Sequence, residues 1–288
     1  MKTVRNNLLL FALTCFGSAG LFAQAVLVNS GSSVVISGGT TLVVQGNIVN
    51  QNSGTFDNSG SINLTGIWEN NAGNAGFVNN SPGTVDLQGA NQDIKGSNAT
   101  DFYNLTLSGT GVKSLLVNTT VKGILDLKDR ELATGNYTLF VDNPAASAVT
   151  FTTGFVSSTG TGTLSRNTNQ SSIYMFPTGS SAGTPRYRPV AINPNTTSAH
   201  TFTVRMANVD TTIESFPTAT NDGSMCALNS NFYHRIGRTA GTNAPDISIY
   251  FDNSLDAAYT GIAQWKTVPQ WENTSAATLT LNSSPPLS

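Results

Sequence analysis

The chain has 288 residues, a formal net charge of −2 and only 10% charged residues, where an average globular protein has about 25%. Nucleic-acid binding requires a concentrated basic face, so this composition excludes nucleic acid as a partner. Hydrophobic residues make up 39% of the chain, which is enough to bury a core and argues against disorder. The polarity comes from Asn, Thr, Ser and Gly, which is typical of short strands joined by tight turns.

Residues 1–23 are predicted to be a signal peptide. Two basic residues open the segment, and the apolar run that follows is too short to span a bilayer. Small residues come next, and cleavage is expected between Ala23 and Gln24, with cleavage after Ala25 as the alternative. The mature protein is therefore expected to be secreted or held at the outer cell surface.

The chain contains two cysteines, and removal of the signal peptide takes Cys15 with it. Cys226 then remains alone, which excludes an intrachain disulfide, and we expect it to be a small buried apolar residue. Lipidation at Cys15 is a weaker alternative, because the residues before it lack the usual Leu. No second apolar run reaches the roughly 20 residues of a membrane-spanning helix, so no transmembrane span is expected after signal removal.

Residues 26–145 repeat a short pattern in which alternating apolar residues are followed by Asn and Gly, as in 46–54 and 66–73. Strand-like runs such as 33–37 and 41–45 recur more often than in a β-sandwich, whose strands are usually 8–12 residues apart. Stacked coils of roughly 20 residues explain the spacing. Asn and Gly then suit the coil corners, where Asn side chains can also stack as a ladder. We therefore predict an all-β fold that begins with a right-handed parallel β-helix.

The composition changes after this repeat. Residues 146–168 are rich in Thr, Ser and Gly and are predicted to form the last coil and a crossover. Residues 169–281 contain longer strand-like runs and several prolines, which predicts an antiparallel β-sandwich. Residues 282–288 have the composition of a linker, which suggests that a further C-terminal domain is missing from this sequence.

Few residues have the types and spacing that catalysis requires. Ser181 stands at the centre of a nucleophile-elbow pattern, but no helix can follow it, so a hairpin turn is the preferred interpretation. His200 and His234 have no metal-ligand neighbours and are expected to be structural or surface residues. The charged cluster at 126–131 is expected to be a solvated turn. We therefore predict no catalytic, cofactor-binding or metal-binding residue and no cofactor, with a β-helix polysaccharide lyase or hydrolase as the third hypothesis.

Three aromatic residues near the C-terminus are candidate ligand contacts. Tyr259, Trp265 and Trp271 lie near one another in sequence and could stack on sugar rings. The competing interpretation, which we favour, is that they fill the core of the sandwich, because aromatic side chains bury large areas there.

Several phrases of the sequence resemble surface proteins exported by the Bacteroidetes type IX secretion system. One is a signal ending in Leu-Phe-Ala-Gln (21–24) before an Asn/Gly-rich β-helix, and others are 83–96 followed by 102–105, and 174–179 with 187–192. The resemblance covers most of the mature chain and carries no catalytic residue. It implies an extracellular, adhesive protein of a family whose C-terminal sorting domain is not present here.

The leading hypothesis from the sequence is a secreted or cell-surface structural or adhesive protein that acts as a non-catalytic display module. Its expected partners are an extracellular glycan or another surface protein. The alternative is a carbohydrate-binding module or a non-catalytic part of a glycan-degrading enzyme. The oligomeric state stays open at this point.

Overall fold

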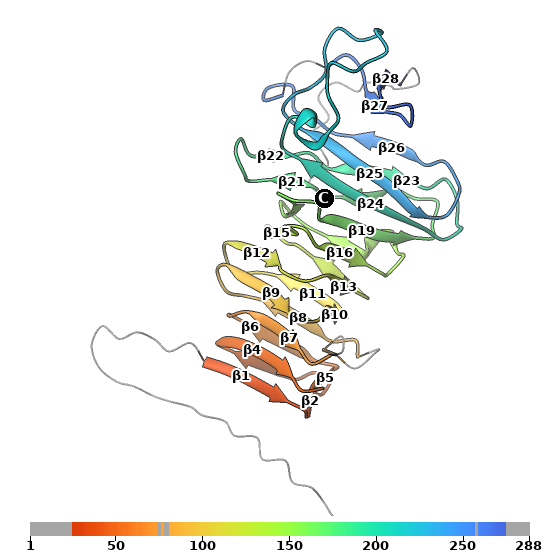
Figure 1. The fold of residues 1–288 in the computed structure, drawn as a ribbon. Coiled ribbons are helices and arrows are strands. Elements are labelled where there is room, and N and C mark those ends of the chain that lie inside the picture. Colours follow the sequence, from red (N-terminus) through yellow and green to blue (C-terminus); the bar gives the residue numbers. More distant parts are fainter. Residues whose placement is uncertain (1–24, 74–75, 78–80, 257–258, 275–288) are drawn as a thin grey trace, which may run out of the picture.

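The computed structural model describes residues 25–73, 76–77, 81–256 and 259–274. Its fold is all-β, with 3% helix, and a parallel β-solenoid of about 7 turns spans residues 25–166. The predicted signal peptide, with its cleavage site at Ala23 and Gln24, and the predicted linker at 282–288 lie outside the described residues. Figure 1 shows the coils stacked as a column, with the C-terminal strands at the end remote from β1 (Ala25–Ser30).

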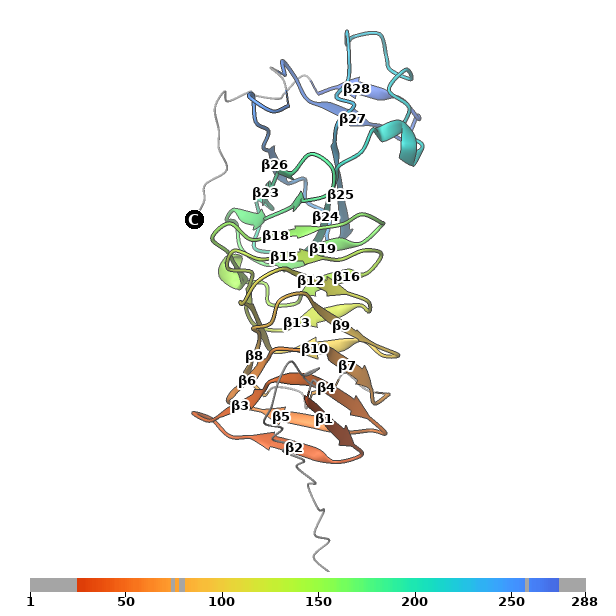
Figure 2. The same ribbon diagram turned by 90° about the vertical axis from the view of Figure 1, so that its left-hand side faces the viewer.

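Two long sheets run along the solenoid, one of seven and one of six parallel strands, and successive coils supply their successive strands. The first sheet has the order β1, β4 (Gly46–Gln51), β7 (Trp68–Asn71), β9 (Gln92–Gly96), β12 (Val112–Leu115), β15 (Glu131–Ala133) and β18 (Phe155–Ser157). The second has the order β3 (Thr41–Val44), β6 (Ser61–Leu64), β8 (Thr84–Leu87), β11 (Asn104–Leu107), β14 (Leu125–Asp126) and β17 (Val149–Thr150), which follows a short 3-10 helix, η1 (Ala146–Ala148). Figure 2 shows these strands side by side along the column.

A third sheet links the solenoid to the C-terminal region. Its parallel part consists of β10 (Thr100–Phe102), β13 (Thr119–Val121), β16 (Thr138–Val141) and β19 (Thr163–Thr168). Antiparallel pairing then adds β24 (His200–Ala207) to β19 and β25 (Tyr233–Ala240) to β24. In the first coils, β2 (Ser33–Ile36) pairs with β5 (Thr55–Asn58) as a separate two-stranded sheet. Parallel pairing therefore continues beyond residue 145, into the segment 146–168 that the sequence predicts to be the last coil and a crossover.

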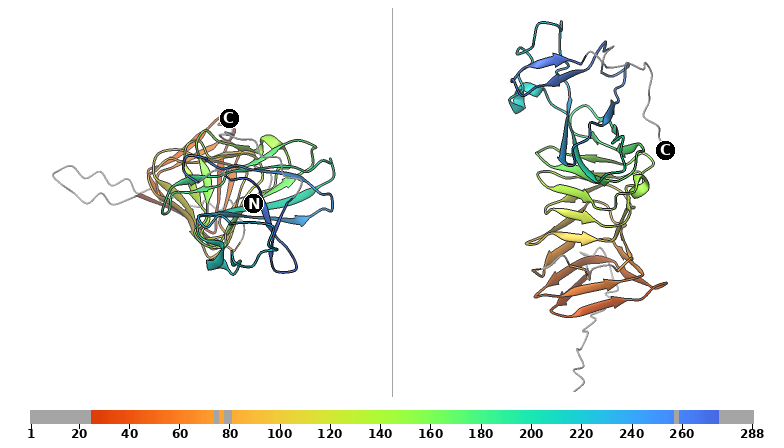
Figure 3. Two further views of the ribbon diagram at one scale, coloured as in Figure 1. Left: turned by 90° about the horizontal axis from the view of Figure 1, so that it is seen from above. Right: turned by 90° about the vertical axis from the view of Figure 1, so that its right-hand side faces the viewer.

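The remaining strands are antiparallel and lie at the C-terminal end of the column (Figure 3). A three-stranded sheet consists of β20 (Tyr174–Phe176), β23 (Val190–Asn193) and β26 (Asp246–Ile249). Two short pairs are β21 (Gly179–Ser180) with β22 (Arg186–Tyr187), and β27 (Ala263–Trp265) with β28 (Trp271–Asn273); a 3-10 helix, η2 (Thr211–Glu214), follows β24. Buried residues of β20, β23 and β24 belong to the same hydrophobic core as the solenoid interior.

The interior of the solenoid is filled by side chains that alternate along each strand between core and surface. Trp68 is fully buried and contacts the rings of Phe56, Phe77 and Phe102, with ring centroids 4.8–5.5 Å apart. Its indole Nε1 donates a hydrogen bond of 3.1 Å to the Thr100 hydroxyl. Because protein interiors are close-packed, these stacked layers make the column a filled rod rather than a pore.

Asparagine side chains join neighbouring coils in two ways. Asn29, Asn50 and Asn70 are buried and form a ladder, in which Asn29 donates to Asn50 (2.9 Å) and Asn50 donates to Asn70 (3.3 Å). Elsewhere the side-chain oxygen of an asparagine accepts the backbone N–H of a residue 20 to 25 positions later, at 2.8–3.0 Å, as seen at Asn47, Asn91, Asn104, Asn118 and Asn136. The repeated Asn thus satisfies backbone donors where coils turn.

Gly96 closes a corner that has no room for a side chain. Its φ is +138°, and a Cβ atom at this position would lie 2.0 Å from the carbonyl oxygen of Asn70. We expect Gly96→Ala to lower the free energy of unfolding by about 2–4 kcal/mol, from the unfavourable φ and from the clash together. Gly39→Ala is the control, because Gly39 also has a positive φ (+76°) but open space around it. Equal losses for the two variants in urea titrations would contradict this account.

Candidate functional site

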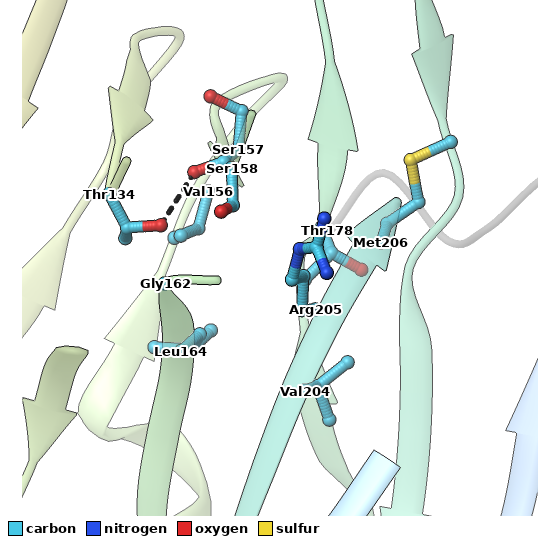
Figure 4. Close-up of a pocket in the computed structure, with 10 residues that line it drawn as sticks. All are labelled: Thr134, Val156, Ser157, Ser158, Gly162, Leu164, Thr178, Val204, Arg205 and Met206. Atoms are coloured by element: carbon cyan, nitrogen blue, oxygen red, sulfur yellow. Dashed lines mark hydrogen bonds between the residues drawn. The ribbon is translucent and has the colours of Figure 1, made fainter. Parts of the chain in front are cut away.

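The clearest cavity lies where the last coils meet the C-terminal region. It has a volume of about 170 Å³ and is lined by residues of the turn after β18, of β21 and the turn that follows it, of β24 and the segment that follows it, and of η2. They are Ser158, Thr159, Ser180, Ala182, Arg205, Asn208, Val209, Ile213 and Glu214. Hydroxyl, amide and charged groups therefore face a space that could hold a small polar molecule. A neighbouring pocket, drawn in Figure 4, shares Ser158 and Arg205 with it and leaves no room for a water molecule.

An ion-pair network forms one wall of this cavity. Arg205 is buried and donates to both carboxylate oxygens of Glu214, with Nη1 2.8 Å from Oε2. The Tyr233 hydroxyl also donates to Glu214, and Arg235 lies 3.6 Å from it. The hydrogen bonds from Arg205 lower the pKa of Glu214 to about 2, against the opposing effect of burial, and the Tyr233 hydroxyl adds to the lowering. The wall therefore presents a fixed, fully ionised pair at neutral pH.

The lowered pKa of Glu214 predicts a loss of stability in acid. The carboxylate stabilises the folded state fully above its ordinary pKa of 4.5, and this contribution disappears as the pH falls toward 2. Because the side chain is 22% exposed, we expect about 1–2 kcal/mol after solvent screening. Urea titrations at pH 7, 4 and 3 should show this loss in the wild type and in Glu272→Gln, but not in Glu214→Gln. A wild-type pH dependence in Glu214→Gln would refute the assignment.

A second ionic network lies deeper in the C-terminal region. The carboxylate of Asp256 is fully buried between Arg186, whose Nε lies 3.0 Å from Oδ1, and Arg188, whose Nε donates to Oδ2. Burial alone would raise the pKa of Asp256, but the hydrogen bond from Arg188 and the backbone N–H of Asp252 bring it below the ordinary value. Both guanidinium groups lie 5.8 Å from the ring centre of Phe232. This network holds β22 against the loop before residue 257, which is a structural role.

The three candidate aromatic residues fall into two groups. Trp265 and Trp271 contact each other, with ring centroids 5.4 Å apart, and Trp271 is buried. Tyr259 instead contacts Phe251 and donates a hydrogen bond to the carbonyl oxygen of Asp256. None of the three is among the residues that line the 170 Å³ cavity. In the structure the two tryptophan rings therefore contact each other, whereas Tyr259 contacts other residues.

The structure shows the surroundings of Ser181, His200 and His234, the residues considered for catalysis or metal binding. Ser181 is exposed in the turn between β21 and β22, which pair as a hairpin. His200 bonds to the carbonyl oxygen of Ser198 through Nδ1 (2.9 Å), and its Nε2 accepts the N–H of Asn243. His234 bonds to the carbonyl oxygen of Arg188 through Nε2 (2.7 Å), and burial of its imidazole lowers its pKa to about 4. The hydrogen bonds of both imidazoles are thus made to backbone groups.

The charged cluster of the solenoid pairs within itself. Lys128 contacts Asp126 at 2.9 Å, and Arg130 contacts Asp129. Glu131 accepts a hydrogen bond from the Ser157 hydroxyl of the next coil. Within the described residues, no group of three or more His, Cys, Asp or Glu side chains is placed to hold a metal ion.

One lysine lies inside the solenoid. Lys113 is fully buried, and its Nζ donates to the carbonyl oxygens of Gly89, Ala90 and Thr110 and to the side chain of Gln92, at 2.6–3.0 Å. Burial lowers the pKa of Lys113 to about 8, and the charge of Arg130 adds to this effect. Because these oxygens belong to coil corners, the ammonium group of Lys113 connects neighbouring coils through hydrogen bonds.

Cys226 corrects one expectation from the sequence. The residue is exposed rather than buried. It lies in an irregular segment between η2 and β25 that forms no strand around it, so no sheet face is available to cover the thiol.

Sequence reasoning missed both ionic networks. Arg186 and Asp256 are 70 positions apart, and no short motif contains both. The only local signal was the spacing of Arg186 and Arg188, which places two cations on the same side of an extended segment. Arg205 and Glu214 are only 9 positions apart, but nothing in their local sequence marks one as buried.

Comparisons with known proteins identify no relative. No family model matches the chain, and no curated protein or solved structure matches it. Among the described residues, no helix has the length and apolar character needed to cross a membrane.

Proposed function

We propose that this protein is a secreted, cell-surface display module with a structural or adhesive role. The observation that carries the proposal is the continuity between the solenoid and the C-terminal strands. β19 pairs in parallel with β16 of the preceding coil and in antiparallel with β24. A filled rod of about 7 turns is thereby joined to the C-terminal region through backbone hydrogen bonds, without a flexible linker.

We infer that the C-terminal region is a β-sandwich that closes the end of the rod, as its sequence suggests. One sheet would be β19, β24 and β25, and the other β20, β23 and β26. Their buried residues, among them Tyr174, Phe176, Phe202 and Val204, share one core. Arg166 supports this arrangement, because its guanidinium group donates to the carbonyl oxygen of Met175 and lies over the rings of Tyr174 and Phe176.

The surface location rests on the predicted signal peptide and on the resemblance to proteins of the type IX secretion system. Antibodies raised against residues 169–274 should label intact cells of the organism that makes the protein. Parallel fractionation should find the chain at the cell surface or in the medium. Recovery of the chain in the cytoplasm, with its first 23 residues retained, would overturn the proposal.

Carbohydrate binding is the second candidate function, and the 170 Å³ cavity is the observation that favours it. Its walls carry hydroxyl groups, the Asn208 amide and the Arg205–Glu214 pair, which are the groups that hydrogen-bond sugar hydroxyls. The expected ligand is a single sugar unit of a surface or extracellular glycan, because the space suits a small polar molecule.

A glycan array tests this second function directly. Ala182 lines the cavity, whereas the neighbouring Ser181 does not, so Ala182→Phe should fill the space and Ser181→Phe is the matched control. Wild-type binding that survives in Ser181→Phe and disappears in Ala182→Phe would support a sugar site here. Failure of the wild type to bind any glycan would leave display as the function.

A further inference from the structure

The three strands of the first coil are each the edge strand of a different sheet. β1 is the end strand of the seven-stranded sheet, β3 the end strand of the six-stranded parallel sheet, and β2 pairs only with β5. One side of each strand pairs with the second coil, and the opposite side has no strand partner among the described residues. Such edges present rows of N–H and C=O groups that can pair with another strand.

This edge lacks the features that usually protect a sheet edge. No charged residue and no proline occurs from Ala25 through Phe56, although lysines, prolines and bulges are the common protection against edge pairing. Four of the outward side chains of the first coil are valines with 49–65% of their surface exposed, Val26, Val28, Val35 and Val43, beside the uncharged Ser30, Ser33 and Thr41. In register with them, the second coil carries Asn47, Val49, Asp57 and Asn63. The apolar surface is therefore concentrated on the terminal coil.

The inward side of the same coil is incompletely covered. Leu27, Val34 and Leu42 pack against the core but are only partly buried, whereas their register partners Ile48, Phe56 and Ile62 in the second coil are completely buried. A further layer of apolar side chains beneath the first coil would remove this difference.

We propose that a second copy of the chain supplies this layer, so that two solenoids join end to end through their first coils. An uncharged edge meets a copy of itself without repulsion, and a two-fold contact requires a self-complementary surface. Antiparallel pairing of β1 with β1 of the second copy, centred on Leu27, places inward Ala25 opposite inward Asn29 and outward Val26 opposite outward Val28. The same two-fold axis brings β2 of one copy to β3 of the other, and both strands have four residues.

The proposal rests on the proposed function in one respect, because it concerns the exported chain from which the predicted signal peptide at 1–23 has been removed. The test therefore uses protein exported by a bacterial host, with its N-terminal sequence determined and its mass measured by sedimentation equilibrium. The expected result is an N-terminus at Gln24, or at Val26 if cleavage follows Ala25, and the mass of a dimer. An N-terminus at Met1 would count against the export proposal, whereas a processed chain that stays monomeric at all concentrations would overturn the dimer.

Two variants locate the contact. Val26→Lys combined with Val28→Lys places like charges opposite each other across the two-fold axis and should raise the dissociation constant at least tenfold. Val49→Lys adds a lysine in the same outward column one coil further in and should leave the dimer intact. Circular dichroism melts confirm that both variants fold, since the changed side chains point outward. A double variant that dimerises as well as Val49→Lys would refute this interface.

Discussion

Replacing Asp256 by asparagine is expected to lower the free energy of unfolding by about 3–5 kcal/mol. The carboxylate is fully buried between Arg186 and Arg188, so its removal leaves two buried cations that share no anion. Arg188 already has one buried nitrogen, Nη2, without a hydrogen-bond partner, which leaves little capacity to compensate. Urea titration followed by circular dichroism measures the loss.

Asp129→Asn is the matched control for this change. Asp129 also contacts an arginine, Arg130, but its side chain is 52% exposed. Exposed ion pairs contribute little to stability because water screens them, so this variant should unfold close to the wild type. If the two substitutions cost the same, the buried network would have no special role in holding the C-terminal region.

Replacing Trp68 by alanine is expected to cost about 3–5 kcal/mol, because it opens a cavity in the middle of the rod. Three phenylalanine rings surround the indole, and the Thr100 hydroxyl loses its donor. In a stacked-coil protein each coil depends mainly on its neighbours. Hydrogen exchange should therefore accelerate first in β4, β7 and β9, and least in β24 and β25.

Trp265→Ala is the comparison for the solenoid variant. Trp265 is only partly buried, so the same substitution should cost about 1–2 kcal/mol there. Exchange that accelerates equally throughout the chain in Trp68→Ala would show that the solenoid and the C-terminal region unfold as one unit. Equal losses of stability in the two variants would contradict the packing described for Trp68.

The sequence was a good guide to strands and a poor guide to long-range contacts. The runs predicted at 33–37 and 41–45 contain β2 and β3, because short apolar, β-branched runs bounded by glycines favour strands. Residues 146–168 are predicted to be the last coil and a crossover from their change in composition. This segment contributes the buried apolar residues Val149, Val156 and Leu164.

The ionic groups of the candidate site could not be predicted in the same way. Arg205 and Asp256 are buried because folding brings together segments that are tens of residues apart in the sequence. Amino-acid composition does not show which segments will meet. The role of asparagine was foreseen only in part. Among the solenoid asparagines, Asn52 has a positive φ, while the ladder and corner asparagines act through side-chain hydrogen bonds between coils.

Surface display is tested most directly by the accessibility of Cys226 on living cells. This thiol is exposed, and the only other cysteine of the chain is Cys15, within the predicted signal peptide. A membrane-impermeant maleimide added to intact cells should label the wild-type protein and leave Cys226→Ser unlabelled. Labelling that requires cell lysis would contradict display at the outer surface.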